Sequence, residues 1–335
     1  MSTPDNDKQC SDSVEMTSNK EECISSEQIN VNNITEDIDS LAVLDDMSTC
    51  ASCGKEGNSN DMNTCNKCKM VKYCNAACKK KHRTKHKKAC ERRVAELHHE
   101  ALFKEVEREE CPICLLPIPL DASQSIFYSC CGKVICNGCI YAMEMSEGKD
   151  LCAFCRSPET TSIDEQIGRI KKLMDRGNAG AHYMKAGDYA QGIMGMPVDL
   201  EKSNQLLLKA GELGCAEAYY NLGQAYDQGR GVERDMKKAK YYWELAAMGG
   251  DLSARHNLAC LEGHSGKYER ATKHFILAAR AGDDQSMGNV TVMFKKGMIT
   301  KDEYEVTLRA YQKSFDDMKS EARDKAAASD FSRRS

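Results

Sequence analysis

The chain has 335 residues, which is room for two or three domains, but only 6% of them are aromatic and one is Trp, a composition that excludes a large apolar core. The formal net charge of −4 is unevenly distributed, because an acidic segment is followed by a basic one. The first residues, MSTPDNDKQC, do not resemble a signal peptide, and no apolar run approaches the ~18 residues of a membrane span. We therefore expect a reducing location, cytoplasmic or nuclear, and no membrane partner.

Residues 1–48 form the acidic segment. They contain twelve Asp and Glu against two Lys and are otherwise rich in Ser, Asn and Thr. Such a segment has too little apolar surface to fold, so we expect a disordered acidic tail. Cys10 and Cys23 lie within it without ligand spacing and are interpreted as free thiols.

Fifteen of the nineteen cysteines fall between Cys50 and Cys155, and ten of them form five Cys-x-x-Cys pairs. Such a pair presents two thiolates on one side of a tight loop, which suits a tetrahedral ion with Zn–S bonds of about 2.3 Å. A disulfide scaffold would require an oxidising compartment, for which the sequence carries no signal. The pattern therefore predicts structural zinc sites that replace an apolar core in the first half of the chain.

The first group of cysteines, residues 50–90, has the spacing Cys-x2-Cys, Cys-x2-Cys, Cys-x3-Cys, His-x3-Cys, with eight ligands for two sites. Together with the Tyr73-Cys74 dipeptide, this spacing resembles a MYND finger. The resemblance implies interleaved ligand sets, one being Cys50, Cys53, Cys74 and Cys78 and the other Cys65, Cys68, His86 and Cys90. It also implies binding of short proline-containing peptides, although Lys79 and His82 stand where the family usually has Gln and Trp. We interpret His82 as a surface residue.

The run KKKHRTKHKK, residues 79–88, makes this finger basic. Residues 50–90 hold eleven Lys and Arg against two acids, and the finger stays near +6 when seven thiolates and two Zn²⁺ are included. An alternative function is therefore a nucleic-acid-associated regulator that uses this surface. We do not favour nucleic acid as a partner, because the run lacks interleaved aromatic residues for base stacking.

Residues 91–110 place Val94, Leu97, Ala101 and Val106 at helical spacing among strong helix formers. This pattern predicts a connecting helix. His98 and His99 lie on it away from any cysteine and are interpreted as part of a solvated face.

Residues 111–158 hold eight further cysteines, and their pattern resembles a RING finger. The resemblance implies one site of Cys111, Cys114, Cys136 and Cys139 and a second of Cys130, Cys131, Cys152 and Cys155. The second site is less regular, because Lys133 occupies the usual histidine position and cannot ligate zinc at neutral pH. Adjacent cysteines share an ion only in a bent backbone, which Gly132 permits, and a site of three thiolates and a water is the alternative.

RING fingers act as ubiquitin ligases by docking a ubiquitin-conjugating enzyme, and the resemblance assigns partner-binding roles to Ile113 and Arg156. Ile113 occupies the docking position between the first two cysteines, and Arg156 follows the last one. Ala153 stands where the family usually has Pro. The alternative is a finger kept for structure or pairing.

From residue 165 a self-similarity with a period of about 36 residues begins, and it predicts a repeat array over residues 165–318. Residues 216–249 combine an Ala-rich helix, a Gly-x-Gly turn and a second helix ending at Gly249, and related segments precede and follow them. This pattern resembles Sel1-like repeats, relatives of tetratricopeptide repeats, over residues 179–282. Capping helices follow, and residues 319–335 are predicted to be helical and then disordered. Cys215 and Cys260 are interpreted as small buried apolar residues.

The predicted fold is therefore mixed, with small zinc-stabilised fingers of little regular structure followed by an all-α solenoid of helix pairs. No nucleotide loop or catalytic triad motif is present in the sequence, so we assign no catalytic residue. The leading hypothesis is a zinc-binding adaptor with four zinc ions, whose fingers recruit protein partners and whose solenoid holds another protein. The alternative is a RING-type ubiquitin ligase that selects its substrate through the repeats.

Overall fold

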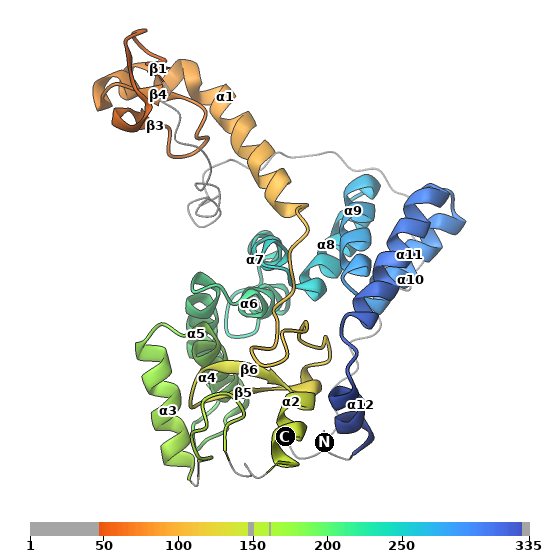
Figure 1. Cartoon of the computed structure of the whole chain (residues 1–335). Helices are drawn as coiled ribbons and strands as arrows, with labels where there is room; N and C mark the ends of the chain where they lie inside the picture. Colours follow the sequence, from red (N-terminus) through yellow and green to blue (C-terminus); the bar gives the residue numbers. More distant parts are fainter. Residues whose placement is uncertain (1–46, 147–150, 161, 330–335) are drawn as a thin grey trace. The chain divides into compact units, whose positions relative to one another are not determined.

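The computed structural model describes residues 47–146, 151–160 and 162–329, so the predicted tail at 1–48 lies almost wholly outside the described residues, as do 330–335. The chain divides into two compact units, Met1–Lys104 and Glu105–Ser335 (Figure 1). Within the described ranges, none of the helices has the length and apolar content needed to span a bilayer.

The first unit holds two short hairpins and one long helix. Strand β1 (Met47–Thr49) pairs antiparallel with β2 (Glu56–Asn58), a 3-10 turn η3 (Ser59–Asp61) follows, and β3 (Asn63–Thr64) pairs antiparallel with β4 (Lys72–Tyr73). The buried side chains include Tyr73, Met62 and four cysteines. Sulfur ligands thus take the place that aliphatic side chains have in a larger core.

Helix α1 (Ala76–Leu102) corrects the predicted connecting helix at 91–110. It starts fifteen residues earlier because the Asn75 side chain caps it, accepting a hydrogen bond from the backbone N–H of Cys78 at 2.8 Å. It ends before the acidic stretch EVEREE, residues 105–110. Carboxylates there would face the negative end of the helix dipole, which disfavours continuation.

The second unit opens with the eight-cysteine segment, here called the RING-like segment (residues 111–158). A 3-10 turn η4 (Ala122–Gln124) leads into the antiparallel hairpin β5 (Ser125–Tyr128) and β6 (Lys133–Cys136), followed by α2 (Asn137–Glu144). Ile135 and Ile140 are its buried aliphatic residues, and cysteines complete the core.

The remainder is helical, as predicted. The helices are α3 (Ile163–Asp175), α4 (Ala179–Gln191), α5 (Leu200–Glu212), α6 (Ala216–Gln228), α7 (Met236–Met248), α8 (Leu252–His264), α9 (Tyr268–Arg280), α10 (Asp284–Lys295), α11 (Lys301–Asp316) and α12 (Glu321–Ala328). Asp side chains at Asp199, Asp235, Asp251 and Asp283 cap four of them. Gly192 and Gly229, both with positive φ, end α4 and α6. The mixed fold class with a helix-pair solenoid is confirmed.

Small residues set the spacing between the helices. Ala186, Ala210 and Ala218 are fully buried, and they let the helix pairs approach closely. Cys215 and Cys260 are half-buried beside these apolar clusters and belong to none of the metal-ligand groups of the described residues.

The RING-like segment packs against the first helices of the array within the same unit. A Cβ at Gly180 in α4 would lie 2.7 Å from the ring of Phe127 in β5, so the two backbones lie close together. Asn178 caps α4 and also donates to the backbone oxygen of Gly132 at 3.3 Å. Arg169 in α3 donates to the Pro158 oxygen at 3.0 Å. The segment and the helices therefore form one folded body.

Candidate metal centres

The structure gathers sixteen Cys and His residues into four groups, and within each group the ligand atoms lie within 4.8 Å of one another. The groups are Cys50, Cys53, Cys74 and Cys78; Cys65, Cys68, His86 and Cys90; Cys111, Cys114, Cys136 and Cys139; and Cys130, Cys131, Cys152 and Cys155. These are the four sets anticipated from the sequence.

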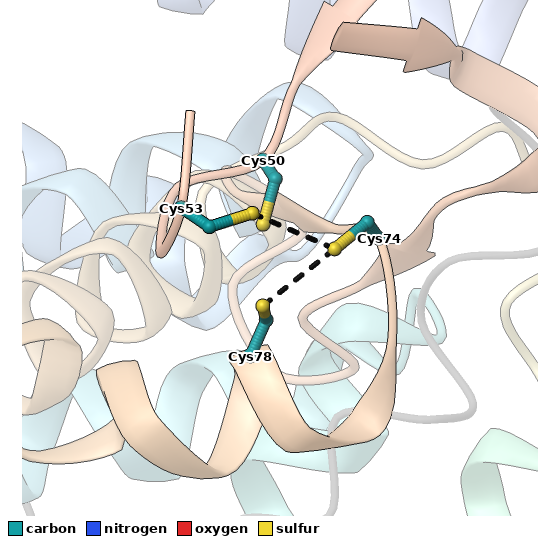
Figure 2. A group of neighbouring side chains, drawn as sticks. All are labelled: Cys50, Cys53, Cys74 and Cys78. Atoms are coloured by element: carbon teal, nitrogen blue, oxygen red, sulfur yellow. Dashed lines mark hydrogen bonds between the residues drawn. The ribbon is translucent and has the colours of Figure 1, made fainter. Parts of the chain in front are cut away.

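The separations between sulfur atoms show which kind of site the groups would fit. In the first group the Sγ atoms of Cys53 and Cys74 lie 3.7 Å apart and those of Cys74 and Cys78 lie 3.6 Å apart (Figure 2). A tetrahedral zinc ion with Zn–S bonds of about 2.3 Å holds its sulfurs about 3.8 Å apart, whereas a disulfide requires about 2.05 Å. The donor set and its spacing therefore fit a divalent ion and not a pair of disulfides.

The second group combines three cysteines with a histidine from α1. Sγ atoms of Cys65 and Cys90 are 3.8 Å apart, and Cys68 Sγ lies 3.3 Å from His86 Nε2. His86 and Cys90 are four residues apart on one helix, so both side chains face the same side. The side chain of His86 is buried beside the three cysteines.

In the RING-like segment, Cys111 and Cys139 are 3.8 Å apart, and so are Cys114 and Cys136. The donors of this group fit zinc in the same way.

The adjacent Cys130 and Cys131 both contribute their sulfur atoms to the fourth group. They lie in the turn between β5 and β6, where Gly132 has φ +69° and donates to the Tyr128 oxygen at 2.8 Å. Cys131 is 3.9 Å from Cys152, and Cys130 is 3.4 Å from Cys155. The bend that the sequence analysis required is present, and Lys133 points into solvent as an exposed side chain.

Four of the five Cys-x-x-Cys pairs share a backbone feature that the sequence analysis missed. The residue after the second cysteine has positive φ in each case: Gly54, Lys69, Leu115 and Arg156. Its N–H donates to the carbonyl oxygen of the first cysteine at 2.9–3.0 Å. Only Gly54 gave a sequence signal, since non-glycine residues rarely adopt this conformation. The strain is maintained because it turns both thiolates toward the ligand centre.

Within a cluster the thiols do not ionise alike. The backbone N–H of Cys74 lowers the pKa of Cys50 to about 6, whereas the hydrogen bond that the Cys74 thiol donates to the Cys78 sulfur raises the pKa of Cys74 to about 12. In the second group, burial opposes ionisation of Cys65, but hydrogen bonds from backbone N–H groups lower its pKa to about 6. Burial raises the pKa of Cys90 to about 12. In these two groups, hydrogen bonds from backbone N–H groups favour ionisation of one thiol, whereas burial or a donated hydrogen bond opposes ionisation of another.

Comparison with known families supports two of these modules. A family model described as MYND finger matches residues 50–90, and one described as Sel1 repeat matches residues 181–215, 216–251 and 252–283. The chain contains a MYND finger and three Sel1 repeats. Both resemblances predicted from the sequence are thereby confirmed. The MYND finger is a zinc-binding module. The RING resemblance rests on the two cysteine groups of residues 111–158 and stays a prediction.

Two solved structures are similar to this chain. A Sel1 repeat protein from Oxalobacter formigenes is 25% identical over 46% of this chain and 65% of its own, with a TM-score of 0.39. The protein c5321, described as a protective antigen present in uropathogenic Escherichia coli strains displaying an SLR fold, is 22% identical over 52% of this chain and 39% of its own, with a TM-score of 0.40. This chain spans less than two thirds of either protein.

The surface of the MYND finger differs from the expectation at His82. His82 is half-buried and lies against Tyr73, whose hydroxyl is 3.2 Å from His82 Nδ1, so it is not a free surface residue as interpreted from the sequence. Lys79 donates to Asn66 Oδ1 at 3.0 Å. The remaining basic residues of the run, including Lys80, Lys81 and Arg83, are exposed.

The two predicted partner-binding residues of the RING-like segment lie on different Cys-x-x-Cys loops, here called knuckles. Ile113 lies between Cys111 and Cys114, and Arg156 follows Cys155. Ile113 is 41% exposed. Arg156 is exposed, but its Nη1 lies 2.7 Å from Met143 Sδ on α2, so its guanidinium turns back toward the segment.

Proposed function

We propose that this protein is a zinc-binding adaptor, in which the MYND finger binds a proline-containing peptide and the Sel1 repeats bind a second protein. The observation that carries the proposal is the presence of both modules in one chain. MYND fingers and Sel1 repeats are both protein-interaction modules, and a chain that carries two such modules can connect two partners.

The adaptor proposal predicts separable partners. Proteins that bind the full chain are identified by affinity capture and mass spectrometry, and each is then tested as a purified protein. His86→Ala removes a ligand of the second cysteine group. It is expected to weaken binding of the partners of the MYND finger tenfold or more and to leave the partners of the Sel1 repeats bound. Cys215→Ser, in a residue outside the metal-ligand groups, is the matched control. A folded, zinc-loaded chain that binds no purified partner would refute the adaptor function.

Each of the four groups is proposed to hold one zinc ion, giving four ions per chain. The donor sets and sulfur separations of the groups support this number. Metal analysis of the purified chain is expected to give four zinc ions, and Cys130→Ser to give three, because the fourth group loses a donor on an already irregular site. Three ions in the unaltered chain would instead show that the fourth group does not hold zinc.

A ubiquitin-ligase function is the second candidate. It is favoured by three apolar side chains exposed on the two knuckles of the RING-like segment: Ile113 at 41%, Leu115 at 67% and Phe154 at 44%. Exposed apolar side chains are available there for contact with a partner protein. We propose Ile113 and Arg156 as contacts of the conjugating enzyme and of its ubiquitin thioester.

Ligase activity is tested with a panel of conjugating enzymes. Ubiquitin chains are expected with at least one enzyme, and Ile113→Ala is expected to reduce their formation about tenfold, because burying this side chain contributes about 1.5–3 kcal/mol. Val292→Ala, at an apolar residue 47% exposed on α10, is the control and should leave the rate unchanged. If no enzyme yields chains, the adaptor function stands alone.

A further inference from the structure

The short helix α12 near the C-terminus lies on the RING-like segment, against α2 (Figure 1). It has eight residues, and its Ala326 is 3% exposed. A helix of this length is marginal in water by itself, so its contact with the segment holds it in place.

Helix α12 contacts α2 at Gly138. A Cβ at Gly138 would lie 2.7 Å from both the Cγ and the backbone N of Arg323, and 3.0 Å from the carbonyl carbon of Ala322. Since Cβ atoms do not approach backbone atoms so closely, only glycine lets α12 come this near.

With α12 packed on Gly138, the guanidinium of Arg323 contacts the first cysteine group of the segment, Cys111, Cys114, Cys136 and Cys139. Nη1 donates to the Pro117 oxygen at 2.9 Å, and Nη2 donates to the Leu116 oxygen at 3.4 Å. Nη2 also donates to the sulfur of Cys114 at 3.5 Å, across 209 residues of sequence. Arg323 therefore touches both a proposed zinc ligand and the loop that follows it.

The charge of the site supports such a contact. Zinc held by four thiolates has a net charge of −2, and a buried negative charge requires compensation. Two half-buried guanidiniums lie against the loop after Cys114, since Arg323 bonds Leu116 and Pro117 while Arg108 donates to the Ile118 oxygen. Their summed charge matches that of the site in magnitude and opposes it in sign.

We propose that Arg323 is a positioning residue for zinc at the group of Cys111, Cys114, Cys136 and Cys139, and that zinc binding there and docking of α12 stabilise each other. The N–H···S bond and the two bonds to the following loop hold the Cys114 sulfur in place beside the other three sulfurs of the group. Zinc in turn fixes the loop whose carbonyl oxygens hold Arg323. Because the coupling is reciprocal, loss of this zinc ion releases α12.

The test uses the full chain loaded with ¹¹³Cd, in which each metal site gives its own NMR resonance. Arg323→Gln is expected to shift one resonance of an all-cysteine site and to leave the others in place. In the zinc-loaded chain, the same change is expected to speed release of one ion to a chromophoric chelator by about tenfold, the lower range for loss of an outer hydrogen bond to a ligand. Arg323→Lys, which keeps the charge but replaces the forked guanidinium with a single donor nitrogen, should recover part of both effects.

Arg309→Gln is the matched control, because this arginine is 70% exposed on α11 and pairs only weakly with Glu305. Gly138→Ala provides an independent variant, since it displaces α12 without removing any charge, and it should shift the same resonance as Arg323→Gln. If Arg323→Gln did not fold, as judged by circular dichroism, Gly138→Ala would decide. Unchanged resonances and release rates in the folded variants would overturn the proposal.

The reciprocal effect is measured on the unaltered chain. Hydrogen exchange of residues 321–328 is expected to rise when a chelator removes zinc, while the exchange of α6 and α7 stays the same. Equal protection of α12 with and without zinc would also overturn the proposal.

Discussion

Removing zinc with a chelator is expected to unfold residues 50–90 and to leave the Sel1 repeats helical. Structural zinc contributes about 10–16 kcal/mol of apparent binding energy, which equals or exceeds the total stability of an ordinary domain. Apart from cysteines, the finger buries few apolar side chains, such as Tyr73 and Met62, so nothing else can replace this contribution. Hydrogen exchange with mass spectrometry should show loss of protection across residues 50–90.

The repeats supply the internal control. Trp243 is the single tryptophan of the chain and is 4% exposed in α7, so its fluorescence should not change on chelation. Adding back zinc should restore protection, whereas Mg²⁺ should not, because it prefers oxygen ligands to thiolates. A metal-free chain whose residues 50–90 keep their protection would contradict the zinc-dependent fold.

The second large effect concerns one methyl group in the repeats. Gly223→Ala in α6 is expected to lower the free energy of unfolding by about 1–3 kcal/mol, because the added Cβ would lie 2.4 Å from Cδ1 and 2.5 Å from Nε1 of Trp243. Helix propensity alone predicts the opposite, a gain of about 0.8–1.0 kcal/mol. The clash is expected to decide the sign because the indole is buried and protein interiors are close-packed.

Gly187→Ala is the matched control, since Gly187 occupies the corresponding position of the preceding repeat and a Cβ there would meet nothing within 4 Å. This change should raise stability by up to about 1 kcal/mol. Urea denaturation followed by circular dichroism measures both variants. Equal stability of Gly223→Ala and the unaltered chain would show that α6 and α7 pack less closely than described.

The ligand groups and the repeats could be predicted because their signals are local. The reach of a Cys-x-x-Cys loop and the tetrahedral preference of zinc restrict how the thiolates combine, and the interleaved sets followed from the MYND resemblance. The repeats were visible because helix capping and small residues recur every 36 residues or so. The start of α1 could not be read in the same way, since the cap at Asn75 lies among metal ligands whose spacing obscured the helix.

The sequence by itself determined that this chain carries cysteine groups with zinc spacing and an array of helix pairs, because both depend on residues near one another along the chain. Only the tertiary structure decided that a side chain has no space at Gly223 but has space at Gly187. It also decided that Lys69, Leu115 and Arg156 adopt positive φ, and that Arg323 donates a hydrogen bond to Cys114. These features depend on contacts between distant residues or on backbone geometry imposed by a whole site, and neither leaves a pattern in local sequence.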